Sequence, residues 1–129
     1  MKKILIILIS IAAIACDKYK AKEPDASFVI KQNDVVLVSG VDSVKYNLNF
    51  VLQHTGTADK VVFFLGTNAH KYSKADNKGQ PADKYGRITG QKFTIPGIMD
   101  TITCIATTIG DYGNEIKQVR SEQAFYIKK

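Results

Sequence analysis

Apolar and polar residues alternate along most of the chain beyond residue 26. In the clearest run, residues 44–53, the apolar positions are Val44, Tyr46, Leu48, Phe50 and Leu52. In a second, β-branched run, residues 101–107, one face carries Ile102, Cys104 and Ala106. A period of two over this length is typical of an antiparallel strand with one buried face. Both runs therefore predict strands.

Shorter segments rich in β-branched and aromatic residues complete the set of predicted strands. They are Ser27–Lys31, Val35–Val38, Val61–Leu65, Lys92–Ile95, Ile116–Arg120 and Ala124–Lys128. Turn-forming residues separate them, and no long stretch after residue 25 shows helical periodicity. About seven short strands in roughly a hundred residues predict an all-β fold, an immunoglobulin-like antiparallel β-sandwich.

The first sixteen residues follow a different pattern. A positively charged start, Met1–Lys3, precedes ten residues, Ile4–Ala13, that are apolar except for Ser10. Small residues then lead to Cys16. This order is typical of a secretory signal, and the apolar run is shorter than the about 20 residues that span a bilayer. The sequence therefore predicts a signal peptide over residues 1–15.

Residues 13–16 (AIAC) resemble the lipobox of bacterial lipoproteins. There the cysteine sulfur receives a diacylglycerol, and the amine freed by cleavage is usually acylated. Ala13 stands where the family prefers leucine, which is a tolerated departure. The resemblance implies lipidation of Cys16 and stable membrane attachment through more than one acyl chain. The alternatives are ordinary cleavage after Ala15 and an uncleaved anchor.

The stretch that follows the lipobox is polar and rich in lysine. We expect residues 16–25 to form the lipidated N-terminus and a tether, because this segment has little apolar surface to bury. Residues 26–129 are then one domain. The only other cysteine is Cys104, so lipidation leaves no partner for a disulfide. Cys104 belongs to the inward set of its strand, which favours a buried thiol over a reactive one.

Charge argues against nucleic acid as a partner. Lys2 and Lys3 lie in the signal, so 18 basic residues fall to 16 against 12 acidic ones, and the net charge falls from +6 to +4. This modest excess is spread along the chain, as in an ordinary solvated surface.

Several segments resemble PKD-like domains, an immunoglobulin-like class common in surface proteins. Residues 24–28 (PDASF) resemble their opening strand, and residues 62–66 (VFFLG) their aromatic strand. Residues 92–97 (KFTIPG) and 100–107 (DTITCIAT) resemble their closing motif. The tryptophan and the Gly-Asp-Gly turn of the family are missing. The resemblance covers most of residues 24–128 and implies fold more than function.

Small lipoproteins of this build are common in Bacteroidetes, often beside glycan-uptake machinery. The resemblance therefore implies a lipid-anchored place in the cell envelope, on the periplasmic or outer face of the outer membrane.

Catalytic and metal-binding chemistry lacks its usual residues. The chain has two histidines, His54 and His70, whereas a Cys/His metal site needs about four ligands. No glycine-rich phosphate loop follows a predicted strand. We therefore predict no metal, no cofactor and no enzymatic activity, while a pair of carboxylates stays open as an alternative.

The longest stretch without a strand pattern is Thr67–Gly90. Connections of this length are uncommon in compact domains and are often functional. The candidate ligand-binding residues are Asn68, His70, Tyr72, Asn77, Tyr85 and Arg87. The tyrosines would present flat faces to a sugar or a partner, with amide and guanidinium groups donating hydrogen bonds. The alternative is a solvated loop, or a polar hairpin with Tyr85 and Ile88 packed on the sheet.

These features favour a membrane-tethered, non-catalytic binding or accessory module. It would be a monomer and would engage a glycan or an envelope protein through residues 67–90. One alternative is a structural spacer of the envelope. Another is an inhibitor or immunity lipoprotein, in which the basic segment blocks the acidic cleft of a foreign enzyme.

Overall fold

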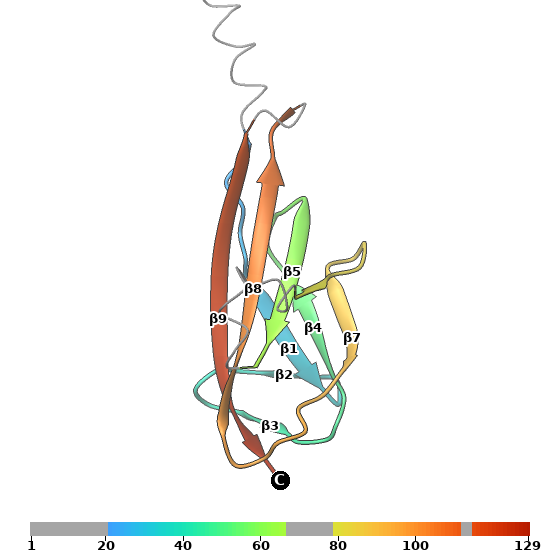
Figure 1. Cartoon of the computed structure of the whole chain (residues 1–129). Coiled ribbons are helices and arrows are strands. Elements are labelled where there is room, and N and C mark those ends of the chain that lie inside the picture. The colour runs from blue at the N-terminus through green and yellow to red at the C-terminus, as the bar shows by residue number, and fades with distance from the viewer. Residues whose placement is uncertain (1–20, 67–78, 112–114) are drawn as a thin grey trace, which may run out of the picture.

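The computed structural model describes residues 21–66, 79–111 and 115–129. Over these residues the chain forms two sheets that face each other (Figure 1). The strands are β1 (Phe28–Gln32), β2 (Val35–Leu37), β3 (Ser43–Lys45), β4 (Phe50–His54), β5 (Lys60–Leu65), β6 (Gln80–Pro81), β7 (Arg87–Gln91), β8 (Met99–Ile109) and β9 (Ile116–Lys128). One sheet has the order β2-β1-β4-β7 and the other the order β3-β9-β8-β5-β6. The prediction of an all-β sandwich is confirmed, but the sheets are not wholly antiparallel as predicted, because β3 pairs with β9 in parallel.

The core lies between the two sheets and consists of the inward residues of each strand. Phe28 of β1 meets Phe63 of β5 edge to face, with ring centroids 5.4 Å apart, so this pair joins the sheets. Cys104 is fully buried in the same core, as its alternation predicts. Burial of one large apolar side chain stabilises the fold by about 1.5–3 kcal/mol.

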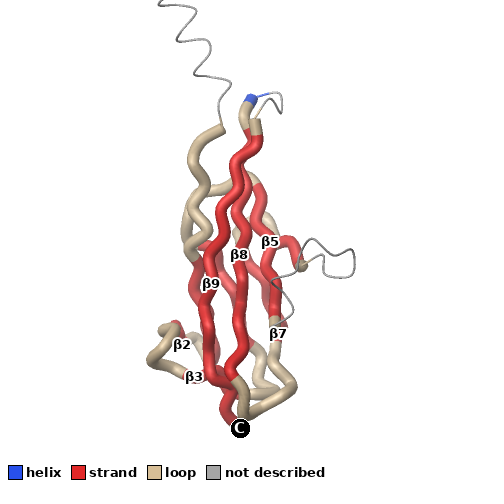
Figure 2. Tube along the Cα trace, turned by 60° about the vertical axis from the view of Figure 1, so that its left-hand side comes forward, coloured by secondary structure: helices blue, strands red, loops and turns tan. Residues whose placement is uncertain are grey.

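The β8–β9 hairpin is the longest element and runs the length of the sandwich (Figure 2). Its register pairs Met99 with Tyr126 at one end and Ile109 with Ile116 at the other. Two separate strands are predicted over residues 116–128, and this prediction is wrong because β9 is continuous. The polar residues in its middle have partners across the open edge of the sandwich.

Those partners are backbone carbonyls of the chain around the start of β1. Ser121 Oγ donates to the carbonyl of Ala26, and Gln123 Nε2 donates to the carbonyl of Phe28 at 2.7 Å. Polar side chains can therefore lie inside a strand without ending it, because each makes a hydrogen bond where it is partly buried.

The prediction of one strand over residues 44–53 is also wrong. The chain crosses from one sheet to the other between β3 and β4, and Asn47 in the turn has a φ of 56°. Buried Gln32 supports this crossover, since its side chain bonds the N–H and C=O of Lys45 and the C=O of Leu48. Alternation persists through the crossover because both strands face the same core.

Residues 92–95 do not form the predicted strand, which is replaced by β7 just before them. Phe93 is nevertheless buried and stacks on Phe50 with ring centroids 5.3 Å apart. The side chain of Phe93 therefore belongs to the core, although its backbone pairs with no strand.

Residues 21–25, which the sequence assigns to the tether, lie against the sandwich. The N–H of Ala21 donates to the Glu115 carboxylate at 3.2 Å, and Thr108 Oγ1 donates to the carbonyl of Lys22. Ala21 is itself buried. Residues 1–20, with Cys16 among them, lie outside the described part of the structure. Among the described residues there is no helix long and apolar enough to cross a membrane.

Candidate functional site

A tight turn at Asp83–Gly86 carries the chain from β6 in one sheet to β7 in the other. The N–H of Gly86 donates to the carbonyl of Asp83, and the N–H of Asp83 donates to the carbonyl of Arg87, each at 2.9 Å. Gly86 has a φ of 76°, a conformation that favours glycine. This is a type I turn followed by a left-handed residue, for which Asp at the first and Gly at the fourth position are preferred.

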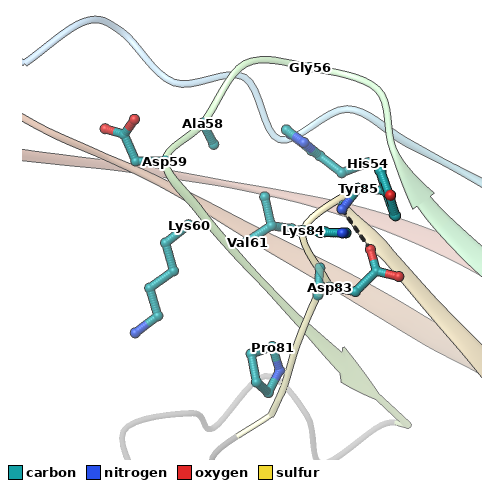
Figure 3. Close-up of a pocket in the computed structure, with 12 residues that line it drawn as sticks. His54, Gly56, Ala58, Asp59, Lys60, Val61, Pro81, Asp83, Lys84 and Tyr85 are labelled. Carbon is teal, nitrogen blue, oxygen red and sulfur yellow. Dashed lines mark hydrogen bonds between the residues drawn. The ribbon is translucent and has the colours of Figure 1, made fainter.

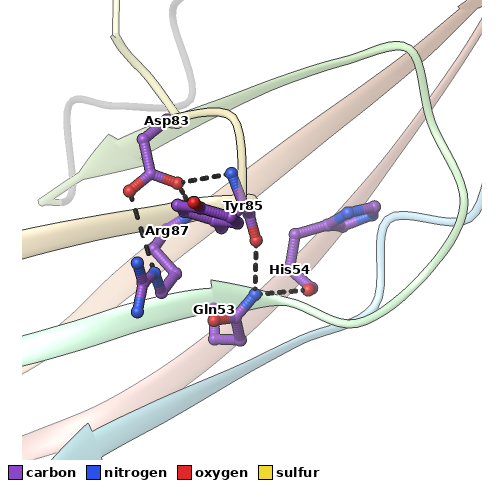
Figure 4. A network of polar contacts seen from close by, with 5 residues as sticks. All are labelled: Gln53, His54, Asp83, Tyr85 and Arg87. Carbon is purple, nitrogen blue, oxygen red and sulfur yellow. Dashed lines mark hydrogen bonds and ion pairs between the residues drawn. The ribbon is translucent and has the colours of Figure 1, made fainter.

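The Asp83 carboxylate organises the turn (Figure 4). Its Oδ1 accepts the backbone N–H groups of Tyr85 at 2.8 Å and Arg87 at 2.9 Å. Its Oδ2 lies 3.7 Å from Arg87 Nε. The backbone N–H of Arg87, followed by that of Tyr85 and by the nearby cations, holds the pKa of Asp83 below its ordinary value. The carboxylate is therefore ionised at neutral pH.

Both sheets hold the turn in place. On the β4 side, Gln53 Nε2 donates to the carbonyls of Tyr85 and His54, each at 2.9 Å, and the N–H of His54 donates to the carbonyl of Gly86. On the β5 side, the N–H of Ala82 donates to the carbonyl of Val61 at 2.9 Å. The turn is preorganised, because its backbone is bonded on either flank.

Tyr85 projects from this turn into solvent. The residue is 61% exposed, although its backbone is fixed. Lys84 Nζ lies 5.0 Å and Arg87 Cζ 4.9 Å from the centroid of its ring. Cation–π contacts of this kind contribute about 0.5–1 kcal/mol at exposed sites. The three side chains form one aromatic, positively charged surface.

A cleft of about 450 Å³ opens between this turn and the β4–β5 connection (Figure 3). Its acidic side chains have internal partners, since Asp59 accepts the N–H of Ile109 at 2.7 Å and Asp83 holds the turn. Lys60 and Lys84 also line the cleft, and within the described residues neither makes an ion pair. The cleft therefore offers ammonium groups to an anionic ligand.

The wall of the cleft depends on Gly56 and His54. A Cβ added to Gly56 would lie 2.4 Å from the carbonyl oxygen of Asp25, so only glycine allows this approach of the two segments. His54 Nε2 lies 2.6 Å from the same oxygen and donates to it. The N-terminal segment thus fixes the shape of the cleft from behind.

A second hollow of about 340 Å³ lies over the outer face of the β2-β1-β4-β7 sheet. Its polar lining includes Lys31, Asn33, Asn49 and Gln53. Arg87 lines this hollow and also contacts the ring of Tyr85, so it joins the amide-rich hollow to the aromatic turn.

Of the candidates taken from the sequence, Tyr85 and Arg87 are brought together in this site. The others, Asn68, His70, Tyr72 and Asn77, lie outside the described residues. The prediction of one continuous connection over residues 67–90 is wrong from residue 80 onward, where β6, the turn and β7 follow. The alternative is a hairpin with Tyr85 and Ile88 packed on the sheet. In the structure Ile88 is buried, as this alternative predicts, whereas Tyr85 is exposed.

Sequence reasoning overlooked the residues that hold Tyr85 in place. Asp83 was detectable, because Asp-Lys-Tyr-Gly at residues 83–86 has the composition of a type I turn. Gln53 and Lys60 had no local signal, since they come from strands far away in the sequence.

Cys104 plays no part in this site. It is fully buried, and burial raises the pKa of its thiol to about 12. The described residues contain no group of three or more His, Cys, Asp or Glu side chains placed to hold a metal ion. Comparison of the chain with protein-family models, with curated proteins and with solved structures gives no match.

Proposed function

We propose that this protein is a lipid-anchored envelope lipoprotein whose sandwich binds an anionic glycan at the Tyr85 turn and catalyses no reaction. The observation that carries the proposal is the combination of a fixed backbone with an exposed aromatic ring at that turn. A solvated loop without a ligand does not require this degree of organisation. Prior ordering of a binding surface lowers the entropic cost of binding.

The chemistry of the surface favours a sugar with acidic groups. The ring of Tyr85 offers an apolar face and edge to the C–H groups of a pyranose. Lys60 and Lys84 offer ammonium groups to carboxylates or sulfates. The amides of Asn33 and Asn49 in the neighbouring hollow can bond hydroxyl groups.

The anchor belongs to the same proposal. Removal of residues 1–15 and lipidation of Cys16 would place the domain in the cell envelope, on the periplasmic or outer face of the membrane. There it would meet glycans and not nucleic acid.

The strand order supports an immunoglobulin-like, PKD-like identity for the domain. In immunoglobulin domains the first, second and fifth strands share one sheet, and the third, sixth and seventh share the other. β1, β4 and β7 would correspond to the first set and β5, β8 and β9 to the second, with β2, β3 and β6 as additions.

Binding to an array of acidic and neutral glycans tests the proposal. We expect acidic glycans to bind, and Tyr85→Ala to weaken binding by roughly tenfold or more, the effect of losing an aromatic hot spot. Tyr126→Ala is the matched control, because Tyr126 is another exposed tyrosine, 46% exposed and on β9. The double variant Lys60→Ala, Lys84→Ala should lose more affinity in low salt than in high salt, because salt screens the charges that it removes.

Absence of binding to every acidic glycan would contradict the proposal, as would equal losses in Tyr85→Ala and Tyr126→Ala. Tight, salt-sensitive capture of one secreted hydrolase would instead favour the inhibitor alternative. A phenotype lost with Cys16→Ser but kept with Tyr85→Ala would favour a structural spacer.

A further inference from the structure

Two isoleucines are exposed at one end of the β8–β9 hairpin. Ile109 is 47% and Ile116 is 65% exposed. They are opposite each other as the last pair of the ladder, so both side chains lie on the same face of the sheet. An exposed pair of this kind has no structural purpose within the sandwich, since it contributes nothing to the core.

The N-terminal segment meets the sandwich at the same end. The N–H of Ala21 is held by the carboxylate of Glu115, the residue before Ile116. Glu23 lies 3.7 Å from Lys117, the residue after it. Ala21 is the fifth residue after Cys16, which allows a reach of at most about 18 Å between the two.

The far end of the molecule is much more distant. β9 has 13 residues and spans about 40 Å, and the C-terminus lies at the end opposite to Ala21 (Figure 1). A lipid on Cys16 therefore enters the bilayer close to the isoleucine pair. When the strands of the sandwich stand perpendicular to the bilayer, the opposite end of the molecule cannot touch the membrane.

We infer that Ile109 and Ile116 form a second membrane contact, which rests on the lipid surface beside the anchor and holds the sandwich upright. This inference rests on the lipidation of Cys16 in the proposed function. Because the tether is short, this end of the sandwich is the part that meets the bilayer when the lipid inserts. Removal of two β-branched apolar side chains from water is then favourable.

The contact is apolar and not electrostatic. Lys117, the residue after Ile116, has its Nζ between two carboxylates, 3.7 Å from Glu23 Oε2 and 3.9 Å from Glu115 Oε1. Asp59 and Asp111 add further negative charge near this end, and Lys22 adds one exposed cation. With this balance of charges, anionic lipids are not required for the contact.

Fluorescence quenching on vesicles tests the inference. The full chain, processed and lipidated in a bacterial host, carries Ile109→Cys, Ile116→Cys or Ile95→Cys and is labelled with an environment-sensitive maleimide dye. It is then reconstituted in phosphatidylcholine vesicles with or without a quencher-bearing lipid. Ile95 is the matched control, because it is 63% exposed, against 65% for Ile116. Buried Cys104 should not take the label.

We expect dyes at 109 and 116 to show blue-shifted emission and a large loss of fluorescence with quencher lipid. The dye at 95 should keep the emission of a dye in water. Addition of phosphatidylglycerol should leave all three results unchanged. Equal quenching at 95 and 116, no quenching at 116, or quenching only with phosphatidylglycerol would each overturn the inference. Circular dichroism identical to wild type shows that each variant is folded.

The unsubstituted, wild-type chain tests lipidation of Cys16 independently of the isoleucine contact. With Cys16 lipidated, wild type has no accessible thiol, takes no dye and sediments with the vesicles. If wild type takes the dye at Cys16 and stays in solution, lipidation is refuted and the inference falls with it. If the wild-type chain sediments and takes no dye, but the dye at position 116 is not quenched, the isoleucine contact is wrong and lipidation of Cys16 stands.

Discussion

The interior of the sandwich and the Tyr85 turn are both well organised, but for different physical reasons. The interior is held by apolar burial, as at Phe63, which is 1% exposed and packs against Phe28. The turn is held by hydrogen bonds to Asp83 and Gln53, while its ring stays in water. The difference predicts that substitutions in the interior lower the stability of the fold, whereas substitution of the Tyr85 ring changes the proposed binding and leaves stability nearly unchanged.

The largest change in stability should come from the interior. Phe63→Ala removes a ring between the sheets and leaves a cavity, so we expect the free energy of unfolding to fall by about 3–5 kcal/mol. Urea unfolding monitored by circular dichroism measures this. A loss no greater than that of Tyr85→Ala would contradict the division between the two regions.

The thiol of the interior provides a second measure, through pH. Because burial raises the pKa of Cys104 from 9.0 to about 12, its thiolate at pH 8 should be roughly a thousandfold rarer than in an unfolded chain. The neutral thiol favours the folded state, so its contribution is complete below pH 9.0 and is lost as pH rises toward about 12. Thiol labelling with and without urea measures this difference, and fast labelling of folded protein would contradict it.

Gln32 connects the interior with the crossover between β3 and β4. Gln32→Ala removes three partly buried hydrogen bonds, two to the backbone of Lys45 and one to that of Leu48, so we expect a loss of roughly 2–3 kcal/mol. Gln118→Ala is the matched control, because in the described part of the chain the exposed Gln118 side chain bonds only the hydroxyl of Thr107. Thermal unfolding compares the two, and equal shifts would show that the crossover does not depend on Gln32.

The turn should respond more weakly. Asp83→Ala removes the acceptor for two exposed backbone N–H groups, so we expect a smaller loss of stability than in Gln32→Ala, together with weaker glycan binding. Asp83→Asn keeps an acceptor oxygen and should retain part of the stability and part of the glycan binding.

The ionisation of Asp83 has its own pH window. Since the pKa of Asp83 is lowered from 3.8, its contribution is complete above that value and is lost as pH falls through the lower folded pKa. Titration of its carboxyl carbon by NMR checks the direction. A midpoint above 3.8 would show that the hydrogen bonds of the turn do not form in solution.

The smallest change in stability should come from Tyr85 itself. Among the described residues the exposed ring makes only two cation–π contacts, so Tyr85→Ala should lower the free energy of unfolding by about 1 kcal/mol or less. The same variant should show the largest loss of glycan binding. A large loss of stability would mean that the ring is part of the fold and not of a binding surface.

Much of the core was predictable from the sequence because local period determines which side chains share a face. The alternation around Cys104 placed it inside, and the apolar character of Phe93 and Ile88 fits positions that are buried. The candidate site was predictable only in part. Tyr85 and Arg87 belong to one short segment, whereas Gln53 and Lys60 reach the same surface only through pairing of distant strands.

By itself, the amino-acid sequence determined the strand character of the chain and its inward faces, and it offers Cys104 no disulfide partner other than Cys16. The tertiary structure decided which sheet each strand joins, where residues 46–49 cross between sheets, and that β9 is continuous. It also placed Ala21 beside Ile116. The physical reason is that side-chain alternation is a local property, whereas strand pairing and hydrogen-bond partners depend on segments that are far apart along the chain.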